Sequence, residues 1–152
     1  MRTLVLALAV LGCAACRKPD LTIDSGPLHV DLAGTGVPGG SLRLSPWRMT
    51  NRGRGVARSG RGAIASSYRL STDPAVTKDD RLLTGGAGLD LGELGPGQSY
   101  QFPGDQQIAI PADVEPGTYY FGVVVDSGDV VEESDETNNV ASVRIGIVKR
   151  PD

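Results

Sequence analysis

The chain has 152 residues, and the part that remains after an N-terminal leader has the size of one ordinary domain, which excludes two independent domains. Apolar residues make up only 39% of the chain and 21 residues are glycine, a composition that argues against a large helical core. With one histidine and two cysteines, the chain has few residues for metal-thiolate or histidine-based chemistry. Its formal net charge is −3.

The N-terminus has the pattern of an export signal. The basic start Met1-Arg2 is followed by an unbroken apolar run over residues 4–11 and then by small residues. This run is far shorter than the ~20 apolar residues that a membrane-spanning helix needs. We expect a signal peptide over residues 1–12, with an alternative end at 15, then a short tether over 13–19, a folded domain over 20–148 and a tail over 149–152.

Both cysteines lie at the expected cleavage zone, so no disulfide can hold the mature domain together. The stretch Val10-Leu11-Gly12-Cys13 resembles a bacterial lipobox, whose cysteine is acylated and becomes the new N-terminus. We expect lipid attachment at Cys13, with Cys16 as the alternative, and several acyl chains would anchor the protein stably. The expected location is the outer membrane or the cell surface, and a periplasmic or secreted protein cleaved after Ala15 is the alternative.

From Asp20 onward, apolar residues alternate in short runs between glycine- and proline-rich turns, which is the period-two pattern of half-buried strands. We expect strands over residues 21–23, 28–32, 41–50, 63–71, 82–84, 99–102, 106–110, 118–126 and 140–148. Many short strands with this punctuation predict an all-β, antiparallel two-sheet sandwich.

Three strand details follow from the pattern. The alternation changes phase across Ser45-Pro46, where proline cannot donate to a ladder, so a bulge or kink is expected there. The strand over 118–126 is apolar on both faces and is therefore expected to be central. Trp47 is expected in the core, whereas His29, the single histidine, is expected to face outward.

Charge is distributed unevenly, with seven arginines and no acid over residues 32–72, and eleven acids and no lysine or arginine over 82–143. Such asymmetry indicates either an interaction patch or two segments that compensate each other across the surface. The glycine- and arginine-rich stretch 52–62 resembles basic segments that hold polyanions, and its candidate contacts are Arg52, Arg54, Arg58 and Arg61. Acidic polysaccharide or lipid headgroups are the expected ligands, against the alternative of a flexible loop paired with the acidic segment. Nucleic acid is not expected, because no aromatic residue is interleaved and the protein is exported.

An acidic stretch places six carboxylates within the eleven residues 126–136. Oxygen ligands at this density suit calcium, and the candidate ligands are Asp126, Asp129, Glu133 and Glu136. The spacing is not that of an EF-hand loop. The alternative is a solvated loop whose side chains form local turns. A weaker acidic cluster, Asp73 with Asp79 and Asp80, is expected to cap turns between strands.

The sequence Val114-Glu115-Pro116-Gly117-Thr118-Tyr119 has the form of a tyrosine corner. Pro116 and Gly117 turn the chain into a strand, and the Tyr119 hydroxyl is expected to bond back to the upstream backbone. The role of all three residues is structural, and loss of this hydrogen bond should cost on the order of 1 kcal/mol.

Several blocks together resemble one family, the cell adhesion related domain found in bacteria, or CARDB. They are Pro19-Asp20-Leu21-Thr22-Ile23, Thr50-Asn51-Arg52-Gly53, Tyr68-Arg69-Leu70-Ser71-Thr72-Asp73, Leu94-Gly95-Pro96-Gly97-Gln98-Ser99, Pro116-Gly117-Thr118-Tyr119-Tyr120 and Glu133-Ser134-Asp135-Glu136-Thr137-Asn138-Asn139-Val140. The resemblance runs in order from about Pro19 to Val148. It implies an immunoglobulin-like sandwich of about seven to nine strands and an extracytoplasmic interaction module, and it implies no reaction.

No serine-nucleophile elbow, zinc-protease helix motif or phosphate-binding glycine loop occurs in the sequence, so we do not expect an enzyme. The expected function is a non-catalytic interaction or adhesion module at the bacterial envelope. The expected partner is an envelope or surface protein, or an acidic polysaccharide. One alternative is a structural accessory subunit of an envelope complex that uses an unpaired edge strand. Another is a carbohydrate-binding module, for which Trp47 is the only strong stacking residue.

Overall fold

The computed structural model describes residues 17–24, 28–31, 36–58, 60, 62–85 and 91–150. The predicted signal peptide and the two candidate lipid-attachment residues, Cys13 and Cys16, lie outside these residues. The described part of the chain contains twelve strands and no α-helix, and none of its segments is a helix that could cross a membrane. The strands are β1 (Leu21–Ile23), β2 (Val30–Asp31), β3 (Ser41–Leu44), β4 (Trp47–Asn51), β5 (Ala57–Arg58), β6 (Ser67–Ser71), β7 (Arg81–Leu83), β8 (Glu93–Leu94), β9 (Ser99–Phe102), β10 (Gln106–Ala109), β11 (Gly117–Val124) and β12 (Val140–Ile147).

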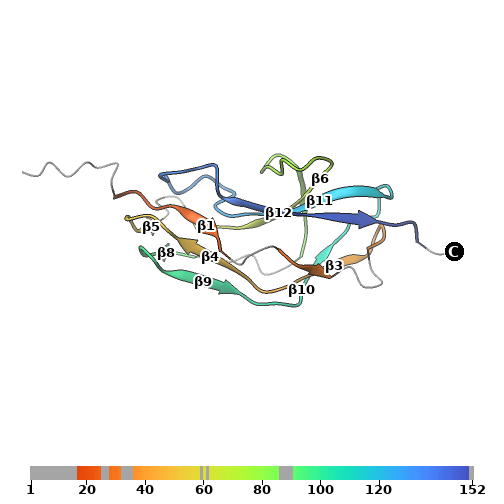
Figure 1. Cartoon of the computed structure of the whole chain (residues 1–152), viewed down its shortest axis with the longest axis horizontal. Helices are drawn as coiled ribbons and strands as arrows, with labels where there is room; N and C mark the ends of the chain where they lie inside the picture. Colours follow the sequence, from red (N-terminus) through yellow and green to blue (C-terminus); the bar gives the residue numbers. More distant parts are fainter. Residues whose placement is uncertain are drawn as a thin grey trace, which may run out of the picture.

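The strands form the two layers of an antiparallel sandwich (Figure 1). One layer is a four-stranded sheet in the order β12-β11-β6-β7. The other is built from two three-stranded pieces, β1-β4-β9 and β10-β3-β2. The chain runs directly from β3 into β4 and from β9 into β10, so the two pieces continue each other. This arrangement confirms the predicted all-β sandwich, and its strand order is that of an immunoglobulin-like fold.

The irregularity predicted at Ser45-Pro46 is present, and it divides the predicted strand 41–50 into β3 and β4. Leu44 pairs with Gln106, whereas Trp47 pairs with Phe102. Two residues therefore separate the paired positions on one strand and three on the other, so the extra residue of the bulge lies on the partner strand. Asp105, within that bulge, has a φ of 60°, which an aspartate tolerates better than most residues.

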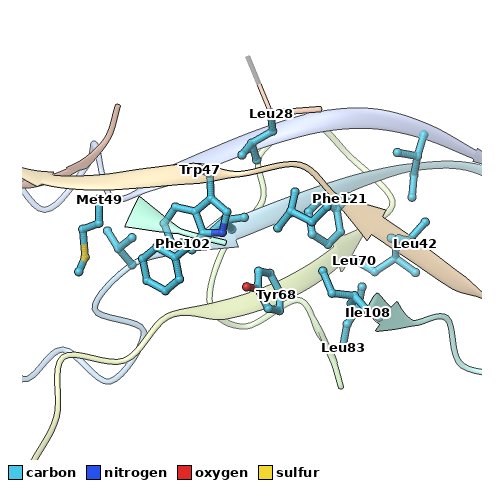
Figure 2. Close-up of a cluster of buried hydrophobic side chains, with 14 of the residues drawn as sticks. Leu28, Leu42, Trp47, Met49, Tyr68, Leu70, Leu83, Phe102, Ile108 and Phe121 are labelled. Carbon is cyan, nitrogen blue, oxygen red and sulfur yellow. The ribbon is translucent and has the colours of Figure 1, made fainter. Parts of the chain in front are cut away.

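Apolar side chains fill the space between the layers, and aromatic rings are among them (Figure 2). Trp47 stacks on Phe102 with ring centroids 3.7 Å apart and an interplanar angle of 6°. The Tyr68 hydroxyl of β6 donates to Gln106 Oε1 of β10 at 2.5 Å, a buried hydrogen bond that joins the layers. Burial raises the pKa of Tyr68. Trp47 is fully buried, which confirms its predicted place in the core.

Strand β11 lies between β12 and β6 and is central, as its two apolar faces predicted. Its outer face is covered by the segment 72–80, which folds back so that Val76 packs against Gly122. A Cβ on Gly122 would lie 2.5 Å from Val76 Cγ1, so only glycine leaves room for this contact. Asp73 and Asp80 close turns of the segment by accepting the N–H groups of Ala75 and Thr77, at 2.8 and 2.7 Å. For Asp79 it is the backbone N–H that bonds, to Thr77 Oγ1.

The structure contains one pair of strands that was not predicted, and one strand is shorter than predicted. Strands β5 and β8 pair with each other in segments where no strand was expected. Each has two residues, too few to show alternation. The strand predicted over 63–71 begins only at Ser67, and upstream of it Ile64 forms an isolated bridge with Leu91.

Candidate functional site

One end of the sandwich gathers three segments: the N-terminal segment 17–20, the arginine loop (described residues 52–58) and the acidic loop 126–139. The N–H of Arg52 donates to Asp20 O at 2.7 Å, and the N–H groups of Arg54 and Gly55 donate to Lys18 O at 3.0 and 3.1 Å. From the other side, the N–H of Ser134 donates to Pro19 O at 2.8 Å. The two loops thus hold the N-terminal segment between them.

Glycines allow the arginine loop to approach this segment closely. A Cβ on Gly53 would lie 2.5 Å from both the carbonyl oxygen of Lys18 and the backbone nitrogen of Asp20. A Cβ on Gly55 would collide with the carbonyl of Arg17. Gly53 and Gly55 therefore allow close backbone packing, a role that the polyanion interpretation did not assign to them.

Asn51, at the end of β4, connects the segments, and its side chain is fully buried. Its Oδ1 accepts the N–H groups of Asp20 and Gly53 at 3.1 and 3.0 Å. Its Nδ2 donates to the carbonyls of Gly55 and Leu94, both at 2.8 Å. All four hydrogen bonds available to the amide are made. Sequence reasoning gave Asn51 no role, because one asparagine after a strand does not differ from an ordinary turn residue.

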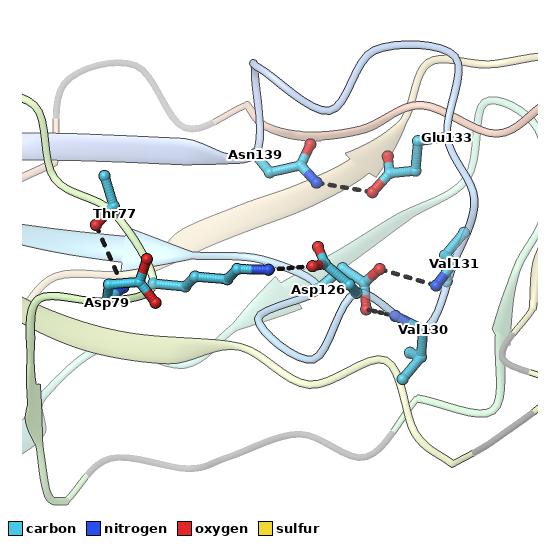
Figure 3. Close-up of polar contacts among 9 residues, drawn as sticks. Thr77, Asp79, Asp126, Val130, Val131, Glu133 and Asn139 are labelled. Atoms are coloured by element: carbon cyan, nitrogen blue, oxygen red, sulfur yellow. Dashed lines mark hydrogen bonds and ion pairs between the residues drawn. The ribbon is translucent and has the colours of Figure 1, made fainter.

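Glu133 performs the matching task from the acidic loop, and its residue is only 4% exposed (Figure 3). Its Oε2 accepts the N–H of Leu21, and its Oε1 accepts Asn139 Nδ2 at 2.8 Å. Burial raises the pKa of Glu133 to about 7, and the negative charges of Glu136 and Asp126 add to the rise. The two hydrogen bonds oppose it. A carboxyl group that holds the first strand is therefore poised to change its charge near neutral pH.

The other predicted calcium ligands shape the acidic loop. Asp126 is buried, and its two oxygens accept the N–H groups of Val130 and Val131 at 3.2 and 2.9 Å (Figure 3). Burial raises the pKa of Asp126, against these hydrogen bonds. Glu136 Oε1 accepts the N–H of Glu133 at 2.8 Å. These contacts are the local turns of the alternative interpretation.

Asp129 is exposed at a φ of 49° and forms an ion pair with Lys78, which reaches it from the segment 72–80. The hydrogen bond and the charge of Asp129 raise the pKa of Lys78. Within the described ranges, no group of three or more histidine, cysteine, aspartate or glutamate side chains is placed to hold a metal ion. The structure does not gather the four predicted ligands into a cage, and calcium binding stays a prediction.

The candidate polyanion contacts are distributed unequally. Arg52 forms an ion pair with Asp24 at 2.9 Å, and Arg58 forms one with Glu93 at 2.5 Å. Arg54 is exposed, and Arg61 lies outside the described residues. The pair Arg58–Glu93 joins the arginine-rich and acid-rich segments, as does Arg43–Asp105 at 3.1 Å. These contacts agree with charge compensation across the surface, and polyanion binding stays a prediction.

The Tyr119 hydroxyl donates to the carbonyl of Glu115 at 2.9 Å, the hydrogen bond that the corner motif predicts. Tyr119 is the third residue of β11, and the strand begins at Gly117, directly after Pro116. Tyr119 is only partly buried and the bond is exposed, so its contribution is smaller than that of a buried bond. His29 is exposed, as expected.

One family model matches most of the chain. The CARDB family model matches residues 18–143. The crystal structure of the CARDB domain of the PF1109 protein from Pyrococcus furiosus, in complex with di-metal ions, is 20% identical with a TM-score of 0.48, covering 88% of this chain and 97% of that one. The solution NMR structure of the same domain is 20% identical with a TM-score of 0.46, covering 87% and 97%. No curated protein matches the chain.

Proposed function

Because the chain belongs to the CARDB family, whose members are generally adhesion-related, we propose that it is a non-catalytic interaction module, exported and lipid-anchored at the bacterial envelope. One observation carries this proposal: Asn51 and the backbone of two loops fix the N-terminal segment to the folded domain, and Glu133 fixes the first residue of β1 directly after it. A chain fixed where it enters the domain transmits the position of an anchor to the whole sandwich.

The distance from anchor to domain is short. If Cys13 carries the lipid, four residue steps lead to Arg17, a reach of at most about 14 Å. The end that carries the acidic and arginine loops then faces the membrane. The opposite end, with the loops 36–40 and 110–116, faces away, and there the N–H of Gly39 donates to Pro111 O at 3.4 Å. Loops held on a rigid sandwich are suited to contact with a partner.

Labelling with radioactive palmitate tests the anchor. Full-length protein should incorporate the label, and Cys13→Ser should lose it whereas Cys16→Ser should keep it. The reverse pattern would move the attachment to Cys16. An unlabelled wild-type protein would contradict the anchor and leave the periplasmic or secreted alternative.

Crosslinking in the native envelope followed by pull-down tests the interaction. One protein recovered specifically supports an interaction module, and its recovery in stoichiometric amount favours the structural accessory subunit described below. Binding to an acidic polysaccharide or to anionic lipid headgroups that falls steeply with added salt would instead support Arg52, Arg54, Arg58 and Arg61 as polyanion contacts. Recovery of neither a protein nor a polyanion would contradict the proposed function.

A structural accessory subunit is the second candidate, and one observation favours it. Strand β7 is the last strand of its sheet among the described strands, and Leu82 on it is 55% exposed. An edge strand with an exposed apolar side chain can add a strand from a partner.

The carbohydrate-binding alternative lacks its stacking residue, because Trp47 is fully buried.

Calorimetry with calcium and with chelator tests the calcium prediction, which requires a higher melting temperature with calcium.

A further inference from the structure

A hollow of about 320 Å³ lies on the outer face of β11 and β12, lined by Thr118, Arg144, Ile145 and Gly146. It lies where β11 begins and β12 ends, at the end of the sandwich opposite the N-terminal segment (Figure 1). We propose that this hollow binds the carboxylate of a uronic acid unit in an acidic polysaccharide. The proposal goes beyond the proposed function, because it gives the domain a saccharide ligand at a site separate from the arginine loop.

Gly146 opens the hollow in the sheet face. It is the seventh residue of β12 and lies directly opposite Thr118 of β11. A Cβ on Gly146 would meet no other described atom within 4 Å, so the space above this residue is open. The side chain of Ile145 is buried in the core, so the strand backbone forms the lining at that position. The side chains that reach the hollow are therefore those of Thr118 and Arg144.

Arg144 lies two residues before Gly146, on the same face of β12. Its Nη2 donates to Thr118 Oγ1 at 3.5 Å, which is longer than a usual hydrogen bond. Arg144 forms no ion pair with a carboxylate of the described residues, whereas Arg43 and Arg81 on other strands each form one. Arginine has five N–H donors, so most of those on Arg144 are available to a ligand.

Positive charge is concentrated where β12 ends. The described residues 144–150 carry three cationic side chains and no carboxylate. In the neighbouring loop 110–116, Asp113 pairs with Arg81, and Glu115 does not line the hollow. A surface with one sign of charge raises the local concentration of ligands with the opposite charge. The ligand that fits the hollow is therefore an anion.

The side chains favour a carboxylate on a sugar. The planar guanidinium of an arginine can donate two parallel hydrogen bonds to a carboxylate, and its single charge matches that group. The Thr118 hydroxyl can donate and accept, as sugar hydroxyls do. An acidic side chain of a protein would also meet Arg144, but protein interfaces are centred on apolar or aromatic anchors, and the side chains that reach this hollow are polar.

The size of the hollow limits the ligand further. Sites for small molecules have volumes of about 300 to 1,000 Å³, and this hollow lies at the lower end of that range. One sugar unit suits this volume. The remainder of a polysaccharide chain would continue across the open outer face.

An NMR titration of the folded domain, residues 17–152, tests the site, since all described strands lie within it. It follows the amide signals of Thr118 and Gly146 and the Nε–H signal of Arg144. The probes are tri-galacturonate, its neutral methyl ester and N-acetyl-glutamate methylamide. We expect saturable shifts with tri-galacturonate and none with the ester, because the ester keeps the sugar rings but loses the charge. Saturation by the glutamate probe, with no effect of tri-galacturonate, would assign the hollow to an acidic protein segment and overturn the saccharide proposal.

Two substitutions change the hollow without touching the core. Arg144→Gln should weaken tri-galacturonate binding about five-fold or more, because the charged hydrogen bonds are lost. Gly146→Val should abolish saturable binding without lowering the melting temperature, since valine suits a strand and its Cβ occupies open space. Arg43→Gln is the matched control, because Arg43 is also an exposed strand arginine but pairs with Asp105 and does not line this hollow.

Arg54→Gln separates this site from the arginine loop. A loss of binding in Arg54→Gln alone would place the polysaccharide on that loop and overturn the proposal. Equal losses in Arg144→Gln and Arg43→Gln, equal shifts with the neutral ester, or no saturable shift with tri-galacturonate would also overturn it.

Protein capture from the native envelope is run in parallel on the wild-type domain. If tri-galacturonate does not bind but a protein is captured, the saccharide proposal alone fails. If the domain binds no tri-galacturonate, no other polyanion and no protein, the proposed function fails as well.

Discussion

Replacing Glu133 with glutamine tests whether a buried carboxyl group near the N-terminal segment reduces stability at neutral pH. The pKa of Glu133 is raised from 4.5 to about 7, chiefly by burial. One pKa unit corresponds to about 1.36 kcal/mol. The rise of about 2.5 units therefore means that ionised Glu133 lowers the free energy of unfolding by about 3 kcal/mol relative to the neutral form.

The sign follows from proton binding. Between pH 4.5 and about 7 the folded protein keeps a proton on Glu133 that the unfolded chain has released. Stability is therefore highest, as far as Glu133 determines it, below pH 4.5, where the carboxyl is neutral in both states. This part of the free energy of unfolding is lost as the pH rises through about 7 and the folded protein must hold an ionised Glu133. Glutamine stays neutral throughout. Its oxygen can accept the N–H of Leu21, and its NH₂ can donate to Asn139 Oδ1 once the asparagine amide turns over.

The assay is urea unfolding of wild type and Glu133→Gln between pH 4.5 and 8. The variant should match wild type near pH 4.5 and exceed it by about 3 kcal/mol at pH 8. Glu132→Gln is the control, because the neighbouring carboxyl is exposed and its ion pair with Lys18 lowers its pKa. Its difference from wild type should not change over this range. A constant difference for Glu133→Gln would refute the reasoning.

Three other substitutions test the packing. Asn51→Ala removes four hydrogen bonds and leaves buried backbone groups unpaired, so urea unfolding should show a loss of about 3 kcal/mol or more; a loss below 1 kcal/mol would contradict its connecting role. Gly122→Ala should cost about 1 to 3 kcal/mol through collision with Val76, and Val76→Ala in the same chain should recover most of it; additive losses would refute the contact. Tyr119→Phe should lower the free energy of unfolding by a measurable amount of less than about 1 kcal/mol, since its bond to Glu115 is exposed, and an unchanged melting temperature would count against the corner.

Strand positions could be predicted where the local sequence shows alternating apolar residues or a proline. The strand Ser99–Phe102 and the break at Ser45-Pro46 are of this kind, because one face is buried or one donor is missing. Strands β5 and β8 could not be predicted in this way, because a strand of two residues cannot show an alternating pattern. The sequence also could not show which strand carries the extra residue of the bulge, because that depends on the register with a strand more than fifty residues away.

The acidic loop shows why the site was harder to predict than the fold. In sequence, Glu132 and Glu133 are equivalent members of a polar run. In the structure the first is exposed and the second is buried beneath the N-terminal segment. That difference depends on a contact with Leu21, more than one hundred residues away. The density of carboxylates led to the prediction of a metal site. Which backbone N–H groups these carboxylates accept depends on the fold and could not be predicted from that density.

Photo-crosslinking in the envelope tests most directly whether this domain is an interaction module. A photoreactive residue is placed at Val140, the exposed first residue of β12, or at Ala112, in the exposed loop at the opposite end of β11. We expect a discrete adduct with one protein from at least one position in the native envelope. No adduct from either position, with the protein present and folded there, would contradict it.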